Sequence, residues 1–311
     1  MESVWLFTDS RLLLHDTGHH PENSSRLRAI ESRLQDSKLR EILPLVTPQP
    51  ATREDILRAH SAKHFDRVNG VAGKSGQFDA DTIYSEQTAG VALLAAGAAI
   101  DAARAVVKGD TLRAMALVRP PGHHATRDRA MGFCFYNNLA VAVRWFQSVE
   151  PDARVAIIDF DVHHGNGTQD IFYEDPNVFF FSIHQVNLFP AFSGSAGEQG
   201  GGAGIGTTLN IPVPPRCSRD AWMQQYAQGI EKVFAFKPDL IFFSAGFDAH
   251  KDDPLGGLSL ESRDFYALTR MVVERSNSHG VRGIVSVLEG GYNLNALAES
   301  VEQHLTALTE A

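Results

Sequence analysis

Short hydrophobic runs alternate with longer segments of helical periodicity along almost the whole chain. Six runs predict β-strands, at residues 4–7, 114–118, 155–160, 178–183, 240–244 and 284–288. They are rich in Val, Ile, Leu and Phe and do not alternate with polar residues, which is typical of parallel strands covered on both faces. Helices are predicted between them, at residues 25–35, 86–107, 138–146, 219–234, 260–276 and 294–308.

This alternation predicts one parallel α/β sheet with helices on both faces. Ser218 and Ser259 are expected to cap two helix N-termini, and Gly109 is expected to end a third helix. A length of 311 residues suggests about two domains, but no linker or repeat divides the chain, so we expect a single domain over residues 1–311. The glycine-rich stretch 194–206 precedes an extended segment, residues 207–213, whereas a dinucleotide-binding loop would open a helix.

Composition excludes several classes of protein. With 43% hydrophobic and 21% charged residues, the chain does not have the composition of a disordered or coiled-coil protein. A net charge of −9 disfavours nucleic acid as a partner. The longest apolar run, residues 90–100, is shorter than the roughly 20 residues of a membrane span. Two cysteines, Cys134 and Cys217, provide no disulfide framework, and we expect a cytoplasmic protein without membrane contact.

Polar and titratable side chains follow five predicted strands at the point where each strand ends. These segments are Arg119-Pro-Pro-Gly-His-His124, Asp159-Phe-Asp-Val-His-His-Gly-Asn-Gly167, His184, Gly246-Phe-Asp248 and Glu289-Gly-Gly-Tyr292. In an open parallel sheet, ligands bind beyond the carboxyl ends of the strands. The sequence therefore predicts that the five segments converge on one site.

The spacing after residues 155–158 indicates a metal site. Strand side chains alternate between two faces, so Asp159, Asp161 and His163 lean to the same side. Together with Asp248 from another strand, Asp161 and His163 form an open three-ligand set of the kind that catalytic zinc uses. In isolation, two such aspartates more often cap a loop, and such a histidine is more often buried and hydrogen-bonded. The polar residues at the neighbouring strand ends favour the metal site over this alternative.

Three further residues are candidates for chemistry beside the metal. An imidazole there can take a proton from water and later protonate a leaving amine, which is a role open to His123 and His124. Tyr292 follows two glycines, and its hydroxyl could stabilise a developing oxyanion. The ordinary alternatives are a surface histidine pair and a half-buried tyrosine.

Five ordered blocks resemble the motifs of zinc-dependent histone deacetylases, in particular class II enzymes and bacterial histone deacetylase-like amidohydrolases. The blocks are Arg119-Pro-Pro-Gly-His-His124, Gly132-Phe-Cys-Phe-Tyr-Asn137, Asp159-Phe-Asp-Val-His-His-Gly-Asn-Gly-Thr168, Ser244-Ala-Gly-Phe-Asp248 and Glu289-Gly-Gly-Tyr-Asn293. Supporting blocks are His20-Pro21-Glu22 with Arg26, Asp79-Ala-Asp-Thr82 and Asp253-Pro-Leu-Gly-Gly257. The resemblance covers roughly residues 15 to 300 and implies the arginase–deacetylase fold, a three-layer α/β domain with a mainly parallel eight-stranded sheet.

The resemblance also implies the reaction, which is removal of acetyl or other acyl groups from N-acyl-lysine or a related amine by metal-activated water. One catalytic Zn²⁺ would be held by Asp161, His163 and Asp248. The resemblance implies that His124 acts first as general base and then as general acid. It implies that His123, hydrogen-bonded to Asp159, assists electrostatically, and that Tyr292 binds the scissile carbonyl oxygen.

Substrate contacts and structural ions follow from the same resemblance. Phe133 and Phe189 are similar to the aromatic walls of the acyl-lysine tunnel, Leu255 to a hydrophobic wall near its mouth, and Asp81 to a rim carboxylate that holds the substrate backbone. K⁺ is a candidate structural ion, and the positions that resemble parts of two monovalent-cation sites are Asp159, His163 and Ser182 for one and Phe172 and Val178 for the other.

Asn166 departs from the class I pattern, which has an aspartate as partner of the second histidine. A neutral amide stabilises an imidazolium less than a carboxylate does, so we predict that His124 is the less basic member of the His123–His124 pair.

Three alternatives differ in metal, substrate or activity. An arginase-like enzyme with two manganese ions would need carboxylates where Gly165 and Gly246 stand. An acetylpolyamine amidohydrolase would share the zinc chemistry, but Leu255 provides no acidic gatekeeper; the acidic net charge keeps this alternative open. An inactive module that binds acylated ligands would lack a metal ligand or the tyrosine, and all are present. The physiological amide, the acyl-chain preference, homo-oligomer formation and the choice between zinc and iron are left open.

Overall fold

The computed structural model describes residues 4–310, and its centre is a sheet of eight strands in the order β2-β1-β5-β10-β9-β6-β7-β8. Every neighbouring pair is parallel. The strands are β1 (Val4–Phe7), β2 (Leu45–Val46), β5 (Arg113–Ala116), β6 (Val155–Asp159), β7 (Val178–Gln185), β8 (Thr208–Val213), β9 (Leu240–Ala245) and β10 (Gly283–Leu288). A separate antiparallel pair joins β3 (Gly76–Gln77) to β4 (Ile83–Tyr84).

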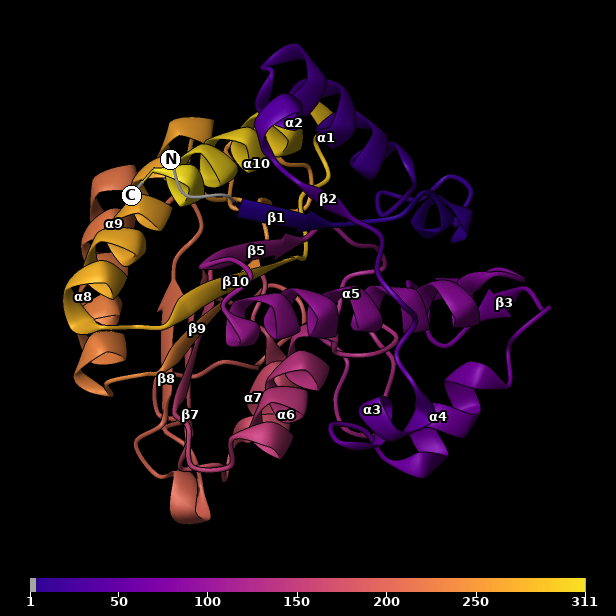
Figure 1. The fold of residues 1–311 in the computed structure, drawn as a ribbon, viewed down its shortest axis with the longest axis horizontal. Helices are drawn as coiled ribbons and strands as arrows, with labels where there is room; N and C mark the ends of the chain where they lie inside the picture. Colours follow the sequence, from indigo (N-terminus) through magenta and orange to yellow (C-terminus); the bar gives the residue numbers. More distant parts are fainter. Residues whose placement is uncertain (1–3, 311) are drawn as a thin grey trace.

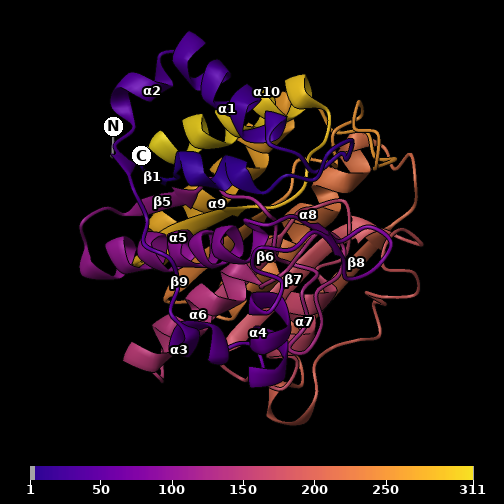
Figure 2. The ribbon, with the colours of Figure 1, turned by 90° about the vertical axis from the view of Figure 1, so that its right-hand side faces the viewer.

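Helices cover both faces of the sheet, which gives three layers (Figures 1 and 2). On one face α1 (Ser25–Asp36), α8 (Arg219–Ala235), α9 (Ser262–His279) and α10 (Leu294–Thr309) pack in sequence, α1 on α10, α10 on α9 and α9 on α8. On the other face α5 (Thr88–Lys108) packs on α6 (Asn138–Val149). The shorter helices are α2 (Leu39–Ile42), α3 (Arg53–Leu57), α4 (Ala62–Asn69), α7 (Asn166–Phe172) and the 3-10 turns Ser10–Leu14 and Gly202–Gly204.

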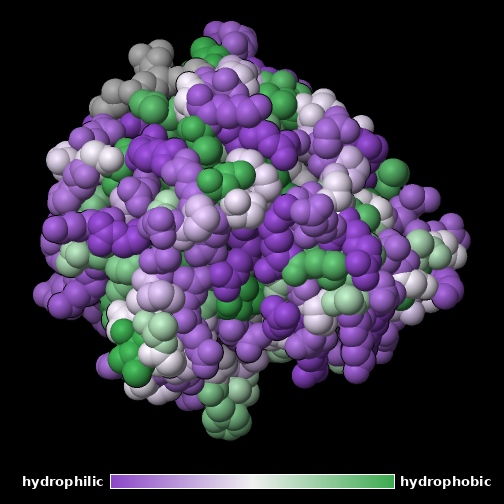
Figure 3. Space-filling model, turned by 60° about the horizontal axis from the view of Figure 1, so that its bottom comes forward, coloured by the Kyte–Doolittle hydropathy of each residue, from purple (hydrophilic) through white to green (hydrophobic). Residues whose placement is uncertain are grey.

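The helix α5 is the one described helix that is long and apolar enough to cross a membrane. In this protein 72% of its most apolar 18-residue window is buried, against β5, β10 and α6. Burial of this kind is what a core helix of a folded domain requires. The face of the molecule in Figure 3 is mainly hydrophilic, with hydrophobic atoms in small separate patches.

The six predicted strands and six predicted helices are present, and the parallel sheet is confirmed. The expected cap at Ser218 is confirmed, because its side chain accepts a hydrogen bond from Ala221 N. The cap expected at Ser259 is wrong. Leu260 forms a β-bridge with His250, so the chain stays extended, and α9 begins only at Ser262 with a capping box from Glu261.

The extended conformation expected for residues 207–213 is confirmed, because residues 208–213 form β8. The sequence pattern did not predict β2, because its two residues are too few to show a periodicity. The strand β7 runs to Gln185, two residues beyond the prediction, so His184 lies within a strand and not after it. Its ring contacts Ser182 Oγ and Gly194 O, and it does not line the cavity described below.

The strand order decides where the polar segments meet. β5, β10, β9 and β6 are direct neighbours at the centre of the sheet, and all point the same way. Their carboxyl ends therefore lie side by side. The segments that follow them carry His123, Asp161, Asp248 and Tyr292.

Candidate active site

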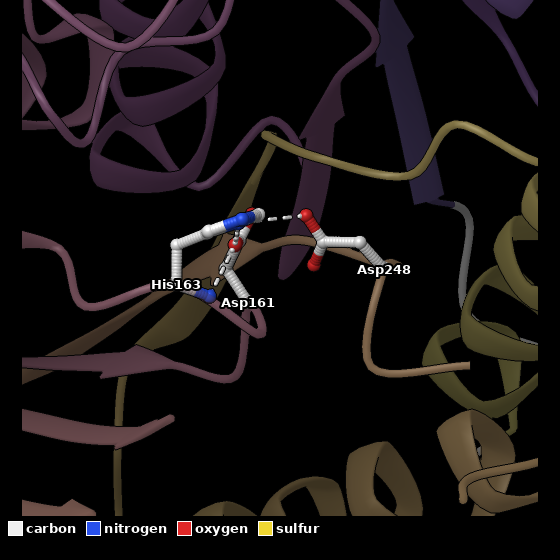
Figure 4. Close-up of side chains that lie close together, drawn as sticks. All are labelled: Asp161, His163 and Asp248. Carbon is white, nitrogen blue, oxygen red and sulfur yellow. Dashed lines mark hydrogen bonds and ion pairs between the residues drawn. The ribbon is translucent and has the colours of Figure 1, made fainter. Parts of the chain in front are cut away.

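Asp161, His163 and Asp248 form one buried cluster (Figure 4). Nδ1 of His163 lies 3.0 Å from Oδ1 of Asp161 and 3.2 Å from Oδ2 of Asp248. The loop after β6 positions the first two residues, and the loop after β9 positions the third. Asp248 Oδ1 also accepts a hydrogen bond from Val162 N at 2.8 Å, which holds the two loops together.

This donor set fits zinc. One ligand atom from each side chain lies within 4.8 Å of the other two. Tetrahedral zinc with bonds of about 2.0–2.2 Å needs neighbouring ligand atoms about 3.3 Å apart, which the two contacts of His163 approach. Burial and the neighbouring Asp161 carboxylate raise the pKa of Asp248 to about 7, so these crowded carboxylates gain from a cation between them.

A second catalytic metal has no room for its ligands. A Cβ at Gly165 would lie 2.2 Å from Asp159 Oδ2, and one at Gly246 would lie 2.0 Å from Asp161 Oδ2. These are the two positions where an arginase-like site would carry carboxylates. Any side chain there would displace the carboxylates that are present, so the packing supports a one-metal site.

The histidine pair has two different partners. His123 Nδ1 lies 3.1 Å from Asp159 Oδ2, and His124 Nδ1 lies 2.8 Å from Asn166 Oδ1. Burial opposes charge on His123, but the carboxylates of Asp161 and Asp159 outweigh it and raise the pKa to about 10. Burial and the nearby His123 and His163 lower the pKa of His124 well below its ordinary 6.5. The prediction that His124 is the less basic member is confirmed in direction, with burial as its first cause.

Glu289 holds the backbone of the segment that carries the histidine pair, a role that sequence reasoning did not assign. Its Oε2 accepts hydrogen bonds from Gly122 N at 2.6 Å and His123 N at 3.1 Å, and Ser244 Oγ donates to Oε1. The side chain is fully buried, and this burial raises the pKa of the carboxyl to about 7. Its place at the end of β10, among strand-end segments, was the available signal.

Tyr292 lies on a turn that buried polar groups hold in place. Gly291 has a φ of +122°, a conformation that glycine adopts readily and other residues rarely adopt. Arg26 donates to the carbonyl oxygens of Gly291 and Glu289, and its guanidinium lies 5.0 Å from the centre of the Tyr292 ring. Burial raises the pKa of the Tyr292 phenol well above its ordinary 10, so the hydroxyl keeps its proton.

Arg26 is itself fixed by a buried charge network. Glu22 accepts from Arg119 at both carboxylate oxygens, at 2.9 and 2.8 Å, and lies 3.3 Å from Arg26. All three side chains are fully buried. The sequence blocks contain these residues, but only the fold shows that they connect the N-terminal segment to the turn of Tyr292.

A cavity of about 360 Å³ leads to the metal cluster. Its lining combines His163 of the metal cluster and the candidate catalytic residues His124 and Tyr292 with the four predicted substrate contacts. The full lining is His20, Pro21, Asp81, His124, Gly132, Phe133, His163, Leu188, Phe189, Leu255 and Tyr292. A larger cavity of about 510 Å³ lies between α1 and β2 and shares no lining residue with it. The chemistry therefore belongs to the smaller cavity.

The aromatic walls of this cavity depend on Gly132. Gly132 has a φ of +57°, and a Cβ there would lie 2.6 Å from both the His124 ring and the Phe189 ring. The next residue, Phe133, has a φ of +68°, an uncommon conformation for a bulky residue. The Phe133 ring meets the Tyr292 ring edge to face at 5.7 Å, and Phe189 meets His124 in the same way at 4.9 Å.

The positions that resemble monovalent-cation sites fall in two places, one next to the loop that carries Asp161 and one at the start of β7. Asp159 and Ser182 are register partners on β6 and β7, and Ser182 Oγ lies 2.9 Å from His184 Nδ1. Phe172 ends α7, and Val178 begins β7; both are buried.

Comparison with known proteins agrees with this arrangement. The family described as histone deacetylase domain matches residues 20–308. A probable deacetylase of Archaeoglobus fulgidus is 39% identical over 294 residues, which cover 93% of this chain and 81% of the relative. A histone deacetylase-like amidohydrolase of Pseudomonas aeruginosa is 39% identical over 276 residues, covering 88% and 73%. Among solved structures, the HDA15 HD domain matches with a TM-score of 0.92 and 33% identity, covering 99% of this chain and 90% of that chain.

These matches agree with one another. The family match spans nearly all of the described chain, and the structural match shows the arginase–deacetylase fold. The two relatives are named as a probable deacetylase and a histone deacetylase-like amidohydrolase. The chain belongs to the histone deacetylase domain family, and it is an enzyme that acts on amides.

Proposed function

We propose that the protein is a zinc-dependent hydrolase that removes acetyl or other acyl groups from N-acyl-lysine or a related acylated amine. The observation that carries the proposal is the cluster of Asp161, His163 and Asp248, which meets the cavity through His163, beside His124 and Tyr292. When bound, zinc supplies Lewis-acid polarisation of the amide carbonyl and activates water for attack.

The histidine pair would divide the proton chemistry. His124 is neutral at pH 7 because its pKa lies well below 6.5, so it can take a proton from the attacking water and return it to the leaving amine. His123, with a pKa of about 10 beside Asp159, keeps its charge and favours the negative charge that develops on the amide oxygen. The protonated phenol of Tyr292 donates a hydrogen bond to that oxygen.

The cavity mouth favours acyl-lysine over a polyamine. Leu255, at the position where an acidic gatekeeper would face a distant ammonium, is apolar, and Asp81 is the one carboxylate among the lining residues. Two aromatic walls, Phe133 and Phe189, suit the methylene chain of an acylated lysine. The exposed Asp81 is available for a backbone amide of a peptide substrate.

K⁺ is proposed as a structural ion at Asp159 and Ser182. Their placement as register partners beside the catalytic loop supports this assignment. Phe172 and Val178 would belong to a second such ion. The cytoplasmic location stays a prediction.

The deciding experiment compares hydrolysis of an acetyl-lysine peptide and acetylputrescine by purified, zinc-loaded protein. We expect a higher kcat/KM on the peptide, because Leu255 leaves the second ammonium of putrescine unpaired. A large preference for acetylputrescine would favour the polyamine alternative, and no hydrolysis of either would favour an inactive binding module. Longer acyl groups on the same peptide would define the chain-length preference.

A further inference from the structure

Asp253 connects the catalytic tyrosine to the wall of the cavity mouth. Its Oδ2 accepts hydrogen bonds from Tyr292 N at 2.6 Å and Asn293 N at 3.2 Å. Its Oδ1 accepts one from Leu255 N at 2.9 Å. The side chain is buried, with 7% of the residue exposed. One carboxylate thus holds two segments that both line the cavity.

The segment after β9 carries Leu255, and the segment after β10 carries Tyr292. Among the described hydrogen bonds, Asp253 is the one side chain that binds the backbone of both residues. The segments are also linked by Phe247 N, which donates to Gly290 O at 3.0 Å, and near the surface by Asn293 Nδ2, which donates to Asp252 O. Arg26 also holds the tyrosine turn, because it donates to Gly291 O. The backbone of the turn is therefore bound by Arg26 at Gly291 O and by Asp253 at Tyr292 N.

The location of Asp253 also explains how an acidic side chain is tolerated there. Asn293 is the N-cap of α10, so the Asp253 carboxylate lies at the N-terminus of a 16-residue helix. The helix dipole and unpaired amide groups at such an end stabilise a negative charge. Three backbone N–H groups donate hydrogen bonds to the Asp253 carboxylate, which is therefore stabilised by backbone groups.

We propose that Asp253 is a positioning residue. It places the Tyr292 hydroxyl where it can donate a hydrogen bond to the amide oxygen in the transition state, and it holds Leu255 in the wall of the cavity mouth. The assignment rests on the proposed amide hydrolysis. Asp253 does not line the cavity and acts through the backbone of two residues that do. Its loss therefore affects turnover through Tyr292 and substrate binding through Leu255.

The first test is Asp253→Ala, with Asp252→Ala as the matched control. Asp252 precedes Asp253 directly, its side chain is 59% exposed, and its carboxylate lies 3.7 Å from His250. We expect Asp253→Ala to lower kcat on an acetyl-lysine peptide about 10- to 100-fold, because small displacements of a catalytic group are costly. Asp252→Ala should retain the wild-type kcat. An unchanged kcat in Asp253→Ala would overturn the proposal.

A double-mutant cycle separates positioning from general structural damage. With Tyr292→Phe as background, adding Asp253→Ala should lower kcat by less than about threefold, because the hydroxyl that Asp253 positions is already gone. An equal fold-loss in both backgrounds would overturn the proposal. Zinc content and melting temperature of each variant show whether it is folded.

Asp253→Asn keeps the proposal testable if the alanine variant does not fold. Its single amide oxygen satisfies two N–H groups if it faces Tyr292 and Asn293, which leaves the NH₂ group opposite Leu255 N. We therefore expect KM to rise about 3- to 10-fold with kcat within about threefold of the wild type. Wild-type values of both kcat and KM would contradict the proposal. If the wild-type protein hydrolyses no amide, the proposed function fails; if it does and the cycle is additive, only the role of Asp253 fails.

Discussion

Nδ1 of His124 lies 2.8 Å from the amide oxygen of Asn166, the first residue of α7. The amide accepts a hydrogen bond from the ring but adds no negative charge. His124 therefore has less to stabilise its protonated form than His123, which faces Asp159. Burial and the nearby His123 and His163 lower the pKa of His124, whereas the carboxylates of Asp161 and Asp159 outweigh burial and raise the pKa of His123, so the pair is divided into a neutral and a charged imidazole.

Replacing Asn166 by Asp should make His124 more basic. A carboxylate at hydrogen-bond distance favours the imidazolium and raises the pKa of His124. Since the neutral form acts as general base, the acidic limb of the kcat/KM profile should move to higher pH. The pH–rate profile on an acetyl-lysine peptide measures this shift. Asn69→Asp, the same change at an exposed position at the end of α4, should leave both limbs in place, and an unmoved profile in Asn166→Asp would contradict the assigned role.

Removing the Tyr292 hydroxyl should reduce turnover far more than substrate binding. The phenol donates to an oxygen whose negative charge grows only toward the transition state, and loss of one such donor costs about 10²- to 10³-fold in kcat. Steady-state kinetics of Tyr292→Phe separate kcat from KM. Tyr266→Phe is the control, since that hydroxyl bonds Glu310 away from the cavity. Full activity of Tyr292→Phe would refute the oxyanion role.

The purified protein should bind one equivalent of zinc. Chelation should abolish activity and lower the melting temperature, because the ion separates the buried carboxylates of Asp161 and Asp248. Metal analysis and a thermal melt with and without added Zn²⁺ test this. His163→Ala should lose the metal, whereas His279→Ala, at an exposed position, should retain it. Two equivalents on the native site would contradict the exclusion based on Gly165 and Gly246.

Glu22→Gln should destabilise the fold by about 3–5 kcal/mol at pH 7, because it leaves Arg119 and Arg26 buried without their anion. Burial opposes the charge on Glu22, but Arg119 and its neighbours lower the pKa from 4.5 to about 2. The carboxylate therefore contributes stability fully above pH 4.5, and this contribution is lost as the pH falls toward 2.

Urea unfolding of wild type and Glu22→Gln across this pH range measures the difference, which should shrink on acidification. Glu54→Gln is the matched control. The Glu54 side chain is 83% exposed and pairs with Arg58 on the surface, so its loss should change stability by less than about 1 kcal/mol. A pH-independent difference for Glu22→Gln would indicate a packing effect and not the charge network.

Much of the fold could be predicted because the central strands are hydrophobic on both faces. The runs at β6, β7, β9 and β10 are almost entirely buried, so their hydrophobic pattern is strong, and their short length and content of Val, Ile and Phe indicate strands. β2, with two residues, and α2, with four, have too few positions to show a period. The missed cap at Ser259 depends on a bridge between His250 and Leu260, a contact between loops that sequence alone does not reveal.

The sequence by itself determined which chemical groups the site would contain. Asp161, His163 and Asp248 could be named because metal ligands follow strand ends with fixed spacing, and Gly165 and Gly246 because they lack side chains. Tertiary structure alone decided how these groups are supported. Glu289 beneath His123, Arg26 against the Tyr292 ring and Asp253 between Tyr292 and Leu255 are contacts across distant segments. Their partners are mostly backbone atoms, which every residue possesses, so only folding selects which of them a buried charge will meet.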